Sequence, residues 1–387
     1  MLLLLAAHGT GDFYATFVAP LLPYFRIELG LTLGGASILG AMHMAVSNYL
    51  QPILGLASEG IGRRRLMAGG VFLATAISLA GLGNHVVTVG ALLVLGAVGV
   101  AAFHPAGAAL AGELGEERRS SNIAAYMVGG NLGVMVPPLL IPRVARFGMG
   151  WVALLAIPGI IFAIMLYRYL PVDDRHAERP RVTLADIREM FRHLWPIHLD
   201  VVLRFFALNA YTLMLPLLGT LREQDQVRAG YSLAFFMFIG AVGVMAGGRL
   251  AERFRERPFL IFGEIVGGIC LILAPTQIGL PFYLLLGIGG FLMFAVTPMQ
   301  IAAAQRLAPK SAGAASGVVM GLAYGNASLL LFPLGWLGNH WTVTTGSELT
   351  SLVRMLQFAS TFILLAGALA FLTKRRDSSP TTESQGH

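Results

Sequence analysis

The chain has 387 residues, of which 56% are hydrophobic and only 12% are charged, and its formal net charge is +7. A soluble domain carries about 25% charged residues, so this composition excludes an ordinary soluble protein and predicts one embedded in a lipid bilayer. A single cysteine excludes an intramolecular disulfide, and neither of the two lysines follows the Gly-rich loop that ATP hydrolysis at a P-loop would need. The arginines are spread over loops instead of forming one patch, which argues against a nucleic-acid partner, and no motif predicts a cofactor.

Twelve stretches of the sequence are apolar and long enough to span a membrane, which takes about 20 residues. In chain order they are Leu2–Pro23, Thr32–Ala57, Leu66–Gly83, Val86–Leu114, Asn122–Val144, Trp151–Leu170, Pro196–Leu221, Tyr231–Leu250, Phe259–Ile278, Pro281–Leu307, Ala312–Leu337 and Leu352–Leu372. We therefore expect an all-α integral membrane protein with an N-terminal six-helix bundle (1–170) and a C-terminal one (196–373). The polar segment 171–195 is predicted to be a cytoplasmic loop with a short amphipathic helix on the membrane surface, and the tail 374–387 is predicted to be disordered.

Several sequence landmarks recur about 195 positions apart and in the same order. The recurring pairs are Pro20-Leu-Leu with Pro216-Leu-Leu, His104-Pro105 with Thr297-Pro298, Gly130-Asn131 with Gly325-Asn326, and Pro138 with Pro333. One order at nearly one offset predicts that the two bundles are parallel copies of the same six-helix unit.

A short basic stretch joins the second and third spans. It carries Gly55, Glu59, Gly62, Arg63 and Arg64, and a weaker copy with Gly248 and Glu252 follows the eighth span. The spacing resembles the loop motif of the major facilitator superfamily, in which Gly, three residues, an acid, two residues and Gly precede Arg-Arg. That acid is usually Asp in the superfamily and is Glu59 here.

The resemblance implies that these loop residues form a gating latch between the two halves on the cytoplasmic side. A short basic loop without a gating role is the alternative. Twenty Lys and Arg residues lie on the side of the spans that holds this loop, and six lie on the other. Because Lys and Arg are enriched in cytoplasmic loops, we expect both termini to be cytoplasmic and the protein to reside in the cell (inner) membrane.

Polar side chains inside the spans are the candidate functional residues, because a charge at the bilayer centre costs roughly 2.5–3.5 kcal/mol. Asp12 and His8 lie four residues apart on one face of the first span and are the predicted proton-coupling pair. A purely structural pair is the alternative. Glu264 in the ninth span is expected to pack against neighbours or to lie at the lipid edge.

Other polar residues of the spans are predicted to line a substrate cavity. They are His43, His104, Asn131, Asp200, Arg204, Asn209, Gln300 and Asn326. Arg204 corresponds to His8 in the repeat, and a cationic cavity would favour an anionic substrate. The alternatives are an Arg204 that only neutralises Asp200 and a buried His104 bound to a carbonyl. The spacing of the histidines predicts no metal site.

Three features resemble the fosmidomycin-resistance branch of the superfamily. They are the His8 and Asp12 pair, the segment Ala102-Phe-His-Pro-Ala-Gly107, and the glycine-rich stretch from Leu307 to Gly325. The resemblance implies drug efflux. In that branch an acid commonly follows His-Pro, whereas Ala106 stands at this position.

Together these patterns predict a secondary active transporter that works by alternating access. We expect proton-coupled efflux of a small anionic or amphiphilic compound by a chain that functions as a monomer. The alternatives are a proton-coupled uptake symporter of a small organic solute and an integral membrane lipid-modifying enzyme. The sequence contains no HExxH or GxSxG motif, and its spacing reveals no pair of carboxylates at a common depth, so an enzyme is not expected.

Overall fold

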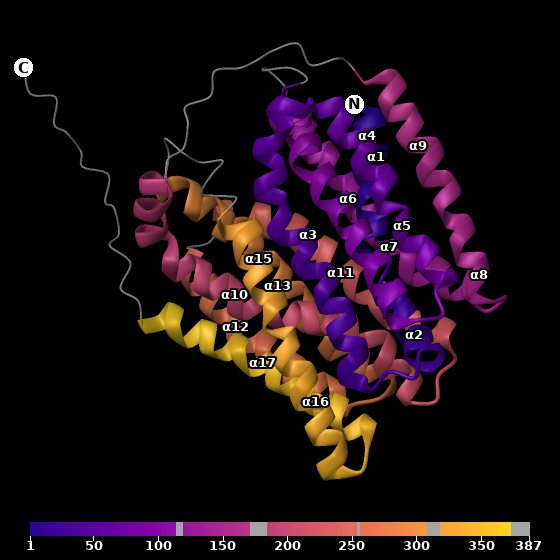
Figure 1. Ribbon diagram of the computed structural model, residues 1–387. Coiled ribbons are helices and arrows are strands. Elements are labelled where there is room, and N and C mark those ends of the chain that lie inside the picture. Colours follow the sequence, from indigo (N-terminus) through magenta and orange to yellow (C-terminus); the bar gives the residue numbers. More distant parts are fainter. Residues whose placement is uncertain (114–118, 171–183, 254–255, 308–317, 373–387) are drawn as a thin grey trace, which may run out of the picture.

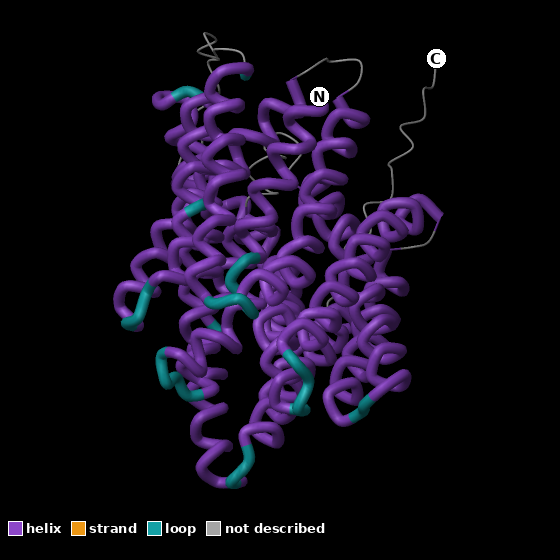
Figure 2. The backbone as a smooth tube through the Cα atoms, turned by 90° about the vertical axis from the view of Figure 1, so that its right-hand side faces the viewer, coloured by secondary structure: helices purple, strands orange, loops and turns teal. Residues whose placement is uncertain are grey.

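The computed structural model describes residues 1–113, 119–170, 184–253, 256–307 and 318–372. All regular secondary structure in these ranges is helical (Figure 2). This confirms the all-α fold.

The N-terminal half is built from long helices and short connecting ones. They are α1 (Leu2–Thr16), η1 (Ala19–Leu21), α2 (Leu22–Glu28), α3 (Leu33–Ile61), α4 (Arg63–Ala74), α5 (Ala76–Leu79), η2 (Ala80–Leu82), α6 (Val86–Glu113), α7 (Arg119–Ala145), α8 (Met149–Val152), η4 (Ala153–Leu155) and α9 (Ala156–Tyr169).

The C-terminal half repeats this pattern. Its elements are α10 (Leu184–Leu221), α11 (Gln226–Arg253), α12 (Glu256–Leu273), η5 (Ala274–Thr276), α13 (Gly279–Leu307), η7 (Val318–Leu322), α15 (Ala323–Leu329), α16 (Leu331–Thr345) and α17 (Glu348–Leu372). Proline interrupts several of these helices without ending them, as at Pro105 in α6 and Pro298 in α13, the pair that recurs in the sequence repeat.

Eleven helical segments of the described residues are long and apolar enough to cross a membrane. The predicted second span is the 29-residue helix α3 and is not among these eleven. Its polar residues, among them His43, Asn48 and Gln51, lower its hydropathy, and α3 packs against α15 and α16 of the other half. A helix between two halves of a protein needs less apolar surface than one that faces lipid.

The two halves use the same helix pairs. In the N-terminal half α3 and α4 pack on α6, and α4 packs on α9; in the C-terminal half α11 and α12 pack on α13, and α12 packs on α17. Each pair in one half is the counterpart of a pair in the other, as two copies of one six-helix unit require. Figure 1 shows the halves side by side, with α3 running along α15.

The structure differs from the sequence prediction in the linker between the halves. Residues 171–183 lie outside the described part of the chain, as does the tail from residue 373. From Leu184 the chain is helical, and α10 continues without a break through Pro196 to Leu221. The short helix that we expected is therefore continuous with the seventh span, and its location on the membrane surface stays a prediction. Pro196 removes one hydrogen bond but does not end the helix.

The halves approach closely where α3 crosses α16. The Gly34 N–H donates to Asn339 Oδ1 at 2.9 Å, and a Cβ atom on Gly34 would lie 2.1 Å from the Gly335 carbonyl oxygen. Beyond the same end of the two helices, Arg26 and Glu348 form an ion pair at 2.5 Å. A helix crossing this tight needs glycine on the facing surfaces.

Gly34→Ala is therefore expected to force α3 and α16 apart. Overpacking of a close contact costs about 1–3 kcal/mol, so the thermal unfolding temperature of the purified protein should fall. Gly69→Ala in α4 is the matched control, because a Cβ atom there meets nothing within 4 Å. Equal unfolding temperatures for the two variants would contradict the observed contact.

Candidate functional site

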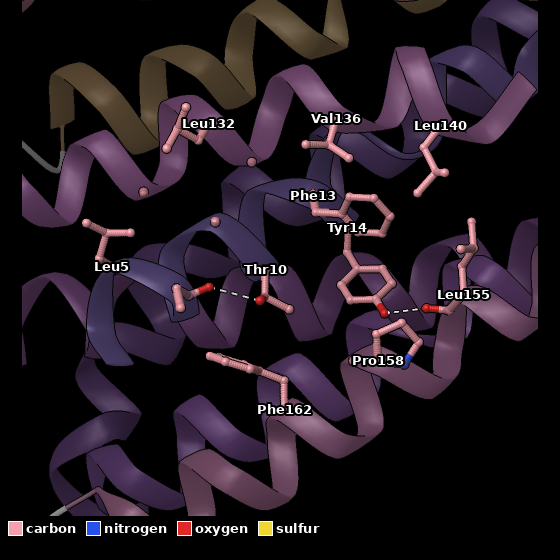
Figure 3. A pocket seen from close by; sticks show the side chains of 15 residues that line it. Leu5, Thr10, Phe13, Tyr14, Leu132, Val136, Leu140, Leu155, Pro158 and Phe162 are labelled. Atoms are coloured by element: carbon pink, nitrogen blue, oxygen red, sulfur yellow. Dashed lines mark hydrogen bonds between the residues drawn. The ribbon is translucent and has the colours of Figure 1, made fainter. Parts of the chain in front are cut away.

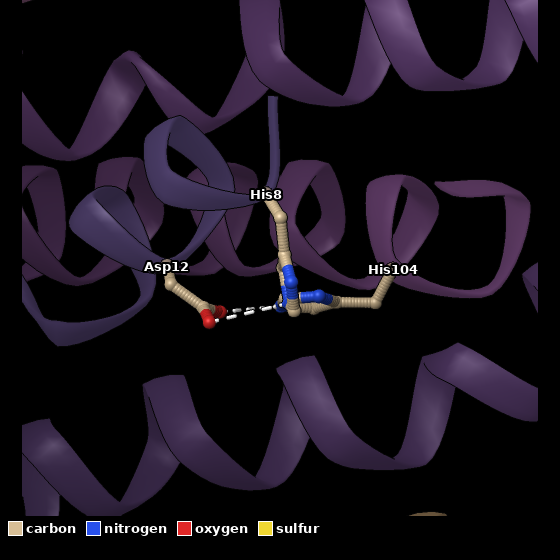
Figure 4. Close-up of side chains that lie close together, drawn as sticks. All are labelled: His8, Asp12 and His104. Carbon is tan, nitrogen blue, oxygen red and sulfur yellow. Dashed lines mark ion pairs between the residues drawn. The ribbon is translucent and has the colours of Figure 1, made fainter. Parts of the chain in front are cut away.

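A cluster of three titratable side chains lies inside the N-terminal half (Figure 4). The Asp12 carboxylate faces two neighbouring imidazoles: its Oδ2 is 3.3 Å from His8 Nε2, and its Oδ1 is 3.3 Å from His104 Nε2. His8 and Asp12 come from successive turns of α1, whereas His104 comes from α6. The sequence predicted the pair on α1, and the structure adds His104 to it instead of placing it in a separate cavity.

The hydrogen bond between His8 and Tyr126 defines which ring nitrogen of His8 carries a proton. Its Nδ1 lies 2.8 Å from the Tyr126 carbonyl oxygen, which can only accept, so Nδ1 carries a proton. The other nitrogen, Nε2, then faces Asp12. A neutral imidazole presents a lone pair there, and an ionised carboxylate has no proton to donate. The contact between His8 and Asp12 is a hydrogen bond only when one extra proton resides on Asp12 or His8.

Glycine at position 130 makes room for this arrangement. A Cβ atom on Gly130 of α7 would lie 2.4 Å from Asp12 Oδ2 and 2.6 Å from His8 Cε1. The His8 ring also stacks on the ring of Tyr126, which like Gly130 belongs to α7, with centroids 3.9 Å apart. Asn131, a predicted cavity residue, follows Gly130 and is half-buried.

Two members of the cluster are partly exposed. His8 is buried, but the side chains of Asp12 and His104 are 18% and 19% exposed. The cluster is therefore not sealed inside the helix packing.

The same three residues also satisfy the spacing of a metal site. One ligand atom from each lies within 4.8 Å of the others, and two imidazoles with one carboxylate suit a divalent transition metal. The sequence analysis predicted no metal site because His104 is distant in the chain. The hydrogen bond from His8 Nδ1 to a carbonyl would also suit a metal ligand, so the geometry is compatible with a bound proton and with a bound metal ion.

A second cluster lies in the C-terminal half around Arg204, which is completely buried. Its guanidinium donates to the Met293 carbonyl oxygen at 2.6 Å, to Thr297 Oγ1 at 2.9 Å and to Gln300 Oε1. The Gln300 amide in turn donates to Asp200 Oδ2. Arg204 and Asp200 are thus connected through Gln300, and the guanidinium faces α13.

Glu264 belongs to this second cluster, which agrees with the expected packing against neighbours and not with the alternative of the lipid edge. Its side chain has no exposed surface, and its carboxyl group faces that of Asp200. The structure therefore contains the pair of neighbouring carboxyl groups that sequence spacing did not reveal. The two residues lie on different helices, 64 positions apart in the chain, so no periodicity connects them.

Polar side chains also join the two halves near the middle of α3. Tyr49 donates its hydroxyl to Asn326 Oδ1, and Asn326 Nδ2 lies 3.0 Å from His198 Nε2. Two residues further along α15, Ser328 Oγ accepts hydrogen bonds from Asn48 and Asn209 at 3.3 Å each. Of these residues, Asn209 and Asn326 were predicted to line the cavity, whereas Tyr49 and Ser328 were missed because their types are common in ordinary packing.

The other predicted residues have more local surroundings. His43 is 2% exposed and lies between the carbonyl oxygens of Leu93 and Ala15 at 3.2 and 3.3 Å, all within the N-terminal half. Gly62 has a φ of +87° and begins α4, as a tight turn between two spans requires.

The predicted latch residues of the N-terminal half lie beside the turn at Gly62, and Gly248 lies in α11. A Cβ atom on Gly55 would lie 3.2 Å from Pro105 of the same half, and a Cβ on Gly248 would meet nothing within 4 Å. Arg63 is buried, and the Arg64 guanidinium lies 4.9 Å from the centre of the Tyr167 ring. The side chains of Glu59 and Glu252 lie outside the described residues, so the latch stays a prediction.

A separate hollow of about 490 Å³ opens between α1, α7 and α9 (Figure 3). Its lining is almost entirely apolar. The hydroxyl groups of Thr10 and Tyr14 are already bonded to the carbonyl oxygens of Ala6 and Leu155. This hollow suits an apolar chain and not a charged solute.

A multi-pass membrane protein of two six-helix halves with buried titratable groups has the architecture of a membrane transporter. The sequence profile of the Major Facilitator Superfamily matches residues 4–333, and the chain belongs to this family. The family consists of transporters, which confirms that the chain is not an enzyme and excludes the lipid-modifying alternative. It also confirms a membrane-embedded protein with a small-molecule substrate.

Two curated bacterial proteins are similar over nearly the whole chain. The chain is 25% identical to an uncharacterized MFS-type transporter, YfnC of Bacillus subtilis, with 94% of this chain and 90% of YfnC covered. It is 24% identical to the probable nitrate transporter NarT of Staphylococcus haemolyticus, with 92% and 91% covered. These relatives do not bear on the fosmidomycin-resistance branch, which stays a prediction.

Solved structures share the fold. A bacterial homolog of the human lysosomal transporter Spinster, in an inward-facing and unoccupied conformation, superposes with a TM-score of 0.80 at 14% identity over 96% of this chain and 95% of that one. A D-xylose–proton symporter superposes with a TM-score of 0.74 at 16% identity over 93% and 96%.

The polar contact between the halves gives a test of this geometry. Tyr49→Phe and Asn326→Ala each remove one partner of the same hydrogen bond, so their effects on unfolding free energy should not add. We expect a coupling energy of about 0.5–1.5 kcal/mol in thermal unfolding of the two single variants and the double variant. Strict additivity would show that the two side chains do not interact.

Proposed function

We propose that the chain is a proton-coupled secondary transporter that exports a small anionic compound in exchange for protons. The observation that carries this proposal is the triad of His8, Asp12 and His104. The contacts of Asp12 with both imidazoles can be hydrogen bonds only when the triad holds one proton more than an ionised carboxylate and two neutral imidazoles. A site that binds a proton inside the membrane and is open to water on one side has what coupling requires.

Protonation changes the charge of the triad from −1 to zero when both histidines are otherwise neutral. A buried net charge is costly in the membrane interior, so the protonated triad tolerates the closing of its water-exposed side better than the unprotonated one. This difference in free energy is what allows proton binding to favour one state of an alternating-access cycle. The proton then leaves when the triad reaches water on the opposite side.

Two observations favour an anionic substrate. The relative NarT is described as a probable nitrate transporter, and nitrate is a small anion. In the present chain, the groups that meet between the halves include hydrogen-bond donors from Tyr49, Asn48 and Asn209. Neutral hydrogen-bond donors without a nearby carboxylate among them suit a small anion.

Export is proposed because the first-span pair and the His104-Pro105 segment resemble an efflux branch of the superfamily. Uptake by symport uses the same triad and is the second candidate, since a nitrate-transporter relative is compatible with either direction. The two differ in a simple measurement. With proteoliposomes loaded with labelled nitrate, an acidic exterior drives efflux by an antiporter, whereas an acidic interior drives it by a symporter.

Asp12→Asn should abolish nitrate flux driven by a pH gradient in these proteoliposomes. It should leave nitrate exchange without a gradient largely intact, because asparagine keeps the shape of the side chain but does not titrate. Asp225→Asn, at an exposed loop position, is the matched control and should keep full gradient-driven flux. Normal gradient-driven flux in Asp12→Asn would refute the proton site, and loss of both activities would indicate a structural role.

Gly130→Ala tests the same site without removing a titratable group. The added methyl group would collide with Asp12 and His8, so gradient-driven flux should fall by at least tenfold. Gly69→Ala, which has open space, should behave like the unmodified chain. Equal flux in both glycine variants would show that the close contact of His8 and Asp12 is not needed.

Metal binding is the competing use of the triad. Calorimetric titration of the purified protein with Zn²⁺ distinguishes the two, with His104→Gln as the variant that removes one ligand. The proton site predicts gradient-driven flux that is unchanged after metal chelation. Zinc bound in a 1:1 ratio, lost in His104→Gln and required for transport would replace the proton proposal.

A further inference from the structure

Among the described residues of the C-terminal half, one arginine and two acids have almost no exposed surface. Arg204 and Glu264 are 0% exposed, and Asp200 is 7% exposed. Asp200 and Arg204 lie one turn apart on α10, and Glu264 reaches them from α12. The charged groups that face Glu264 are these two residues of α10. From the other helices around it, α13 contributes Gln300, and α17 contributes the backbone at Gly367.

Glu264 has no hydrogen-bond donor other than its neighbouring acid. Among the described residues, neither carboxyl oxygen of Glu264 has an N–H or O–H partner, although both are buried. The group that its carboxyl approaches is the carboxyl of Asp200. Two ionised carboxylates in this position would only accept hydrogen bonds and would repel each other, so one of the two acids carries a proton.

The surroundings decide which acid carries it. Asp200 Oδ2 accepts a hydrogen bond from the Gln300 amide, whose own oxygen accepts from Arg204. This chain stabilises the ionised form of Asp200 and connects it to the guanidinium. Glu264 has no such support, so its charged form is the more costly one in the membrane interior. Glu264 is therefore the protonated member and donates to Asp200.

The charge balance agrees with this assignment. With one proton on the pair, Arg204 and the ionised Asp200 cancel, and the cluster is neutral. Without the proton, the cluster would hold a net charge of −1 with two like charges in contact, which is the situation that keeps one acid of a buried carboxyl pair protonated.

We propose that Asp200 and Glu264 form a second proton-binding site, located in the C-terminal half and separate from the triad at Asp12. The proton resides on Glu264 and exchanges with water through Asp200, which is the only member of the pair with exposed surface. This site goes beyond the proposed coupling at Asp12, and its test does not depend on transport.

Infrared spectroscopy of the protein in lipid can detect the proton directly. The carbonyl stretch of a protonated carboxyl group is distinct from carboxylate bands and shifts in deuterated water. At neutral pH we expect such a band in the unmodified protein, its shift on deuteration, and its disappearance as pH rises. Glu264→Gln should remove it, because glutamine replaces the protonated acid with an amide donor of the same length.

Asp200→Asn is the second variant and guards against a folding defect in the first. Its amide would donate to Glu264, so the proton is no longer needed and the same band should be lost. Asp12→Asn should keep the band removed by Glu264→Gln, which separates this site from the triad. The control Asp225→Asn should leave the spectrum unchanged.

Three results would overturn the proposal. One is the absence of a protonated-carboxyl band in the unmodified protein at neutral pH. Another is a protonated-carboxyl signal that is as strong in folded Glu264→Gln or Asp200→Asn protein as in the unmodified protein. The third is a band that does not shift in deuterated water, which would indicate a trapped structural proton that does not exchange.

Discussion

A charge inside a membrane must find its partners within the protein, and both clusters of this chain obey that constraint. Arg204 is surrounded by a backbone carbonyl, a hydroxyl and an amide, all from α13. Asp12 has an imidazole on each of its oxygens, one of them from α6. Because lipid cannot replace these partners, the helices that supply them are held in fixed register. The packing of the first and fourth spans of each half therefore follows from where the charges lie.

Small residues make these contacts possible. Gly130 leaves space for the side chains of His8 and Asp12, and a Cβ atom on Gly367 would lie 3.3 Å from that of Glu264. At such positions glycine does more than bring two helices together. It provides the volume that a polar cluster occupies, so an added methyl group acts on the titratable groups without changing any of them. In the sequence the abundant glycine predicts close helix packing. At these two positions glycine also leaves the space that the titratable side chains occupy.

The sequence predicted the architecture well, since apolar length identifies spans and the constant offset identifies the repeat. It also predicted that His8, Asp12 and Arg204 matter, because each is a charge or titratable group at membrane depth. It did not predict that Glu264 joins Asp200, or that His104 completes the site at Asp12. Those contacts connect helices far apart in the chain, and side-chain spacing reports only neighbours on one helix. The continuity of α10 through Pro196 was missed for a related reason: a proline within a polar segment is typical of a boundary, yet here it lies inside a helix.

The two halves use equivalent positions for different chemistry. His8 and Arg204 occupy matching places in the repeat, and so do His104 and Thr297. In the structure His8 lies beside His104 in the N-terminal half, and Arg204 lies beside Thr297 in the C-terminal half. Histidine changes its charge near neutral pH, whereas arginine stays protonated. In the proposed function the N-terminal cluster alternates between charge states around Asp12, while Arg204 provides a permanent cation. A variable charge beside Arg204 must then come from the neighbouring acids, Asp200 and Glu264. The repeat thus combines two histidines and an aspartate in one half with an arginine and two acids in the other.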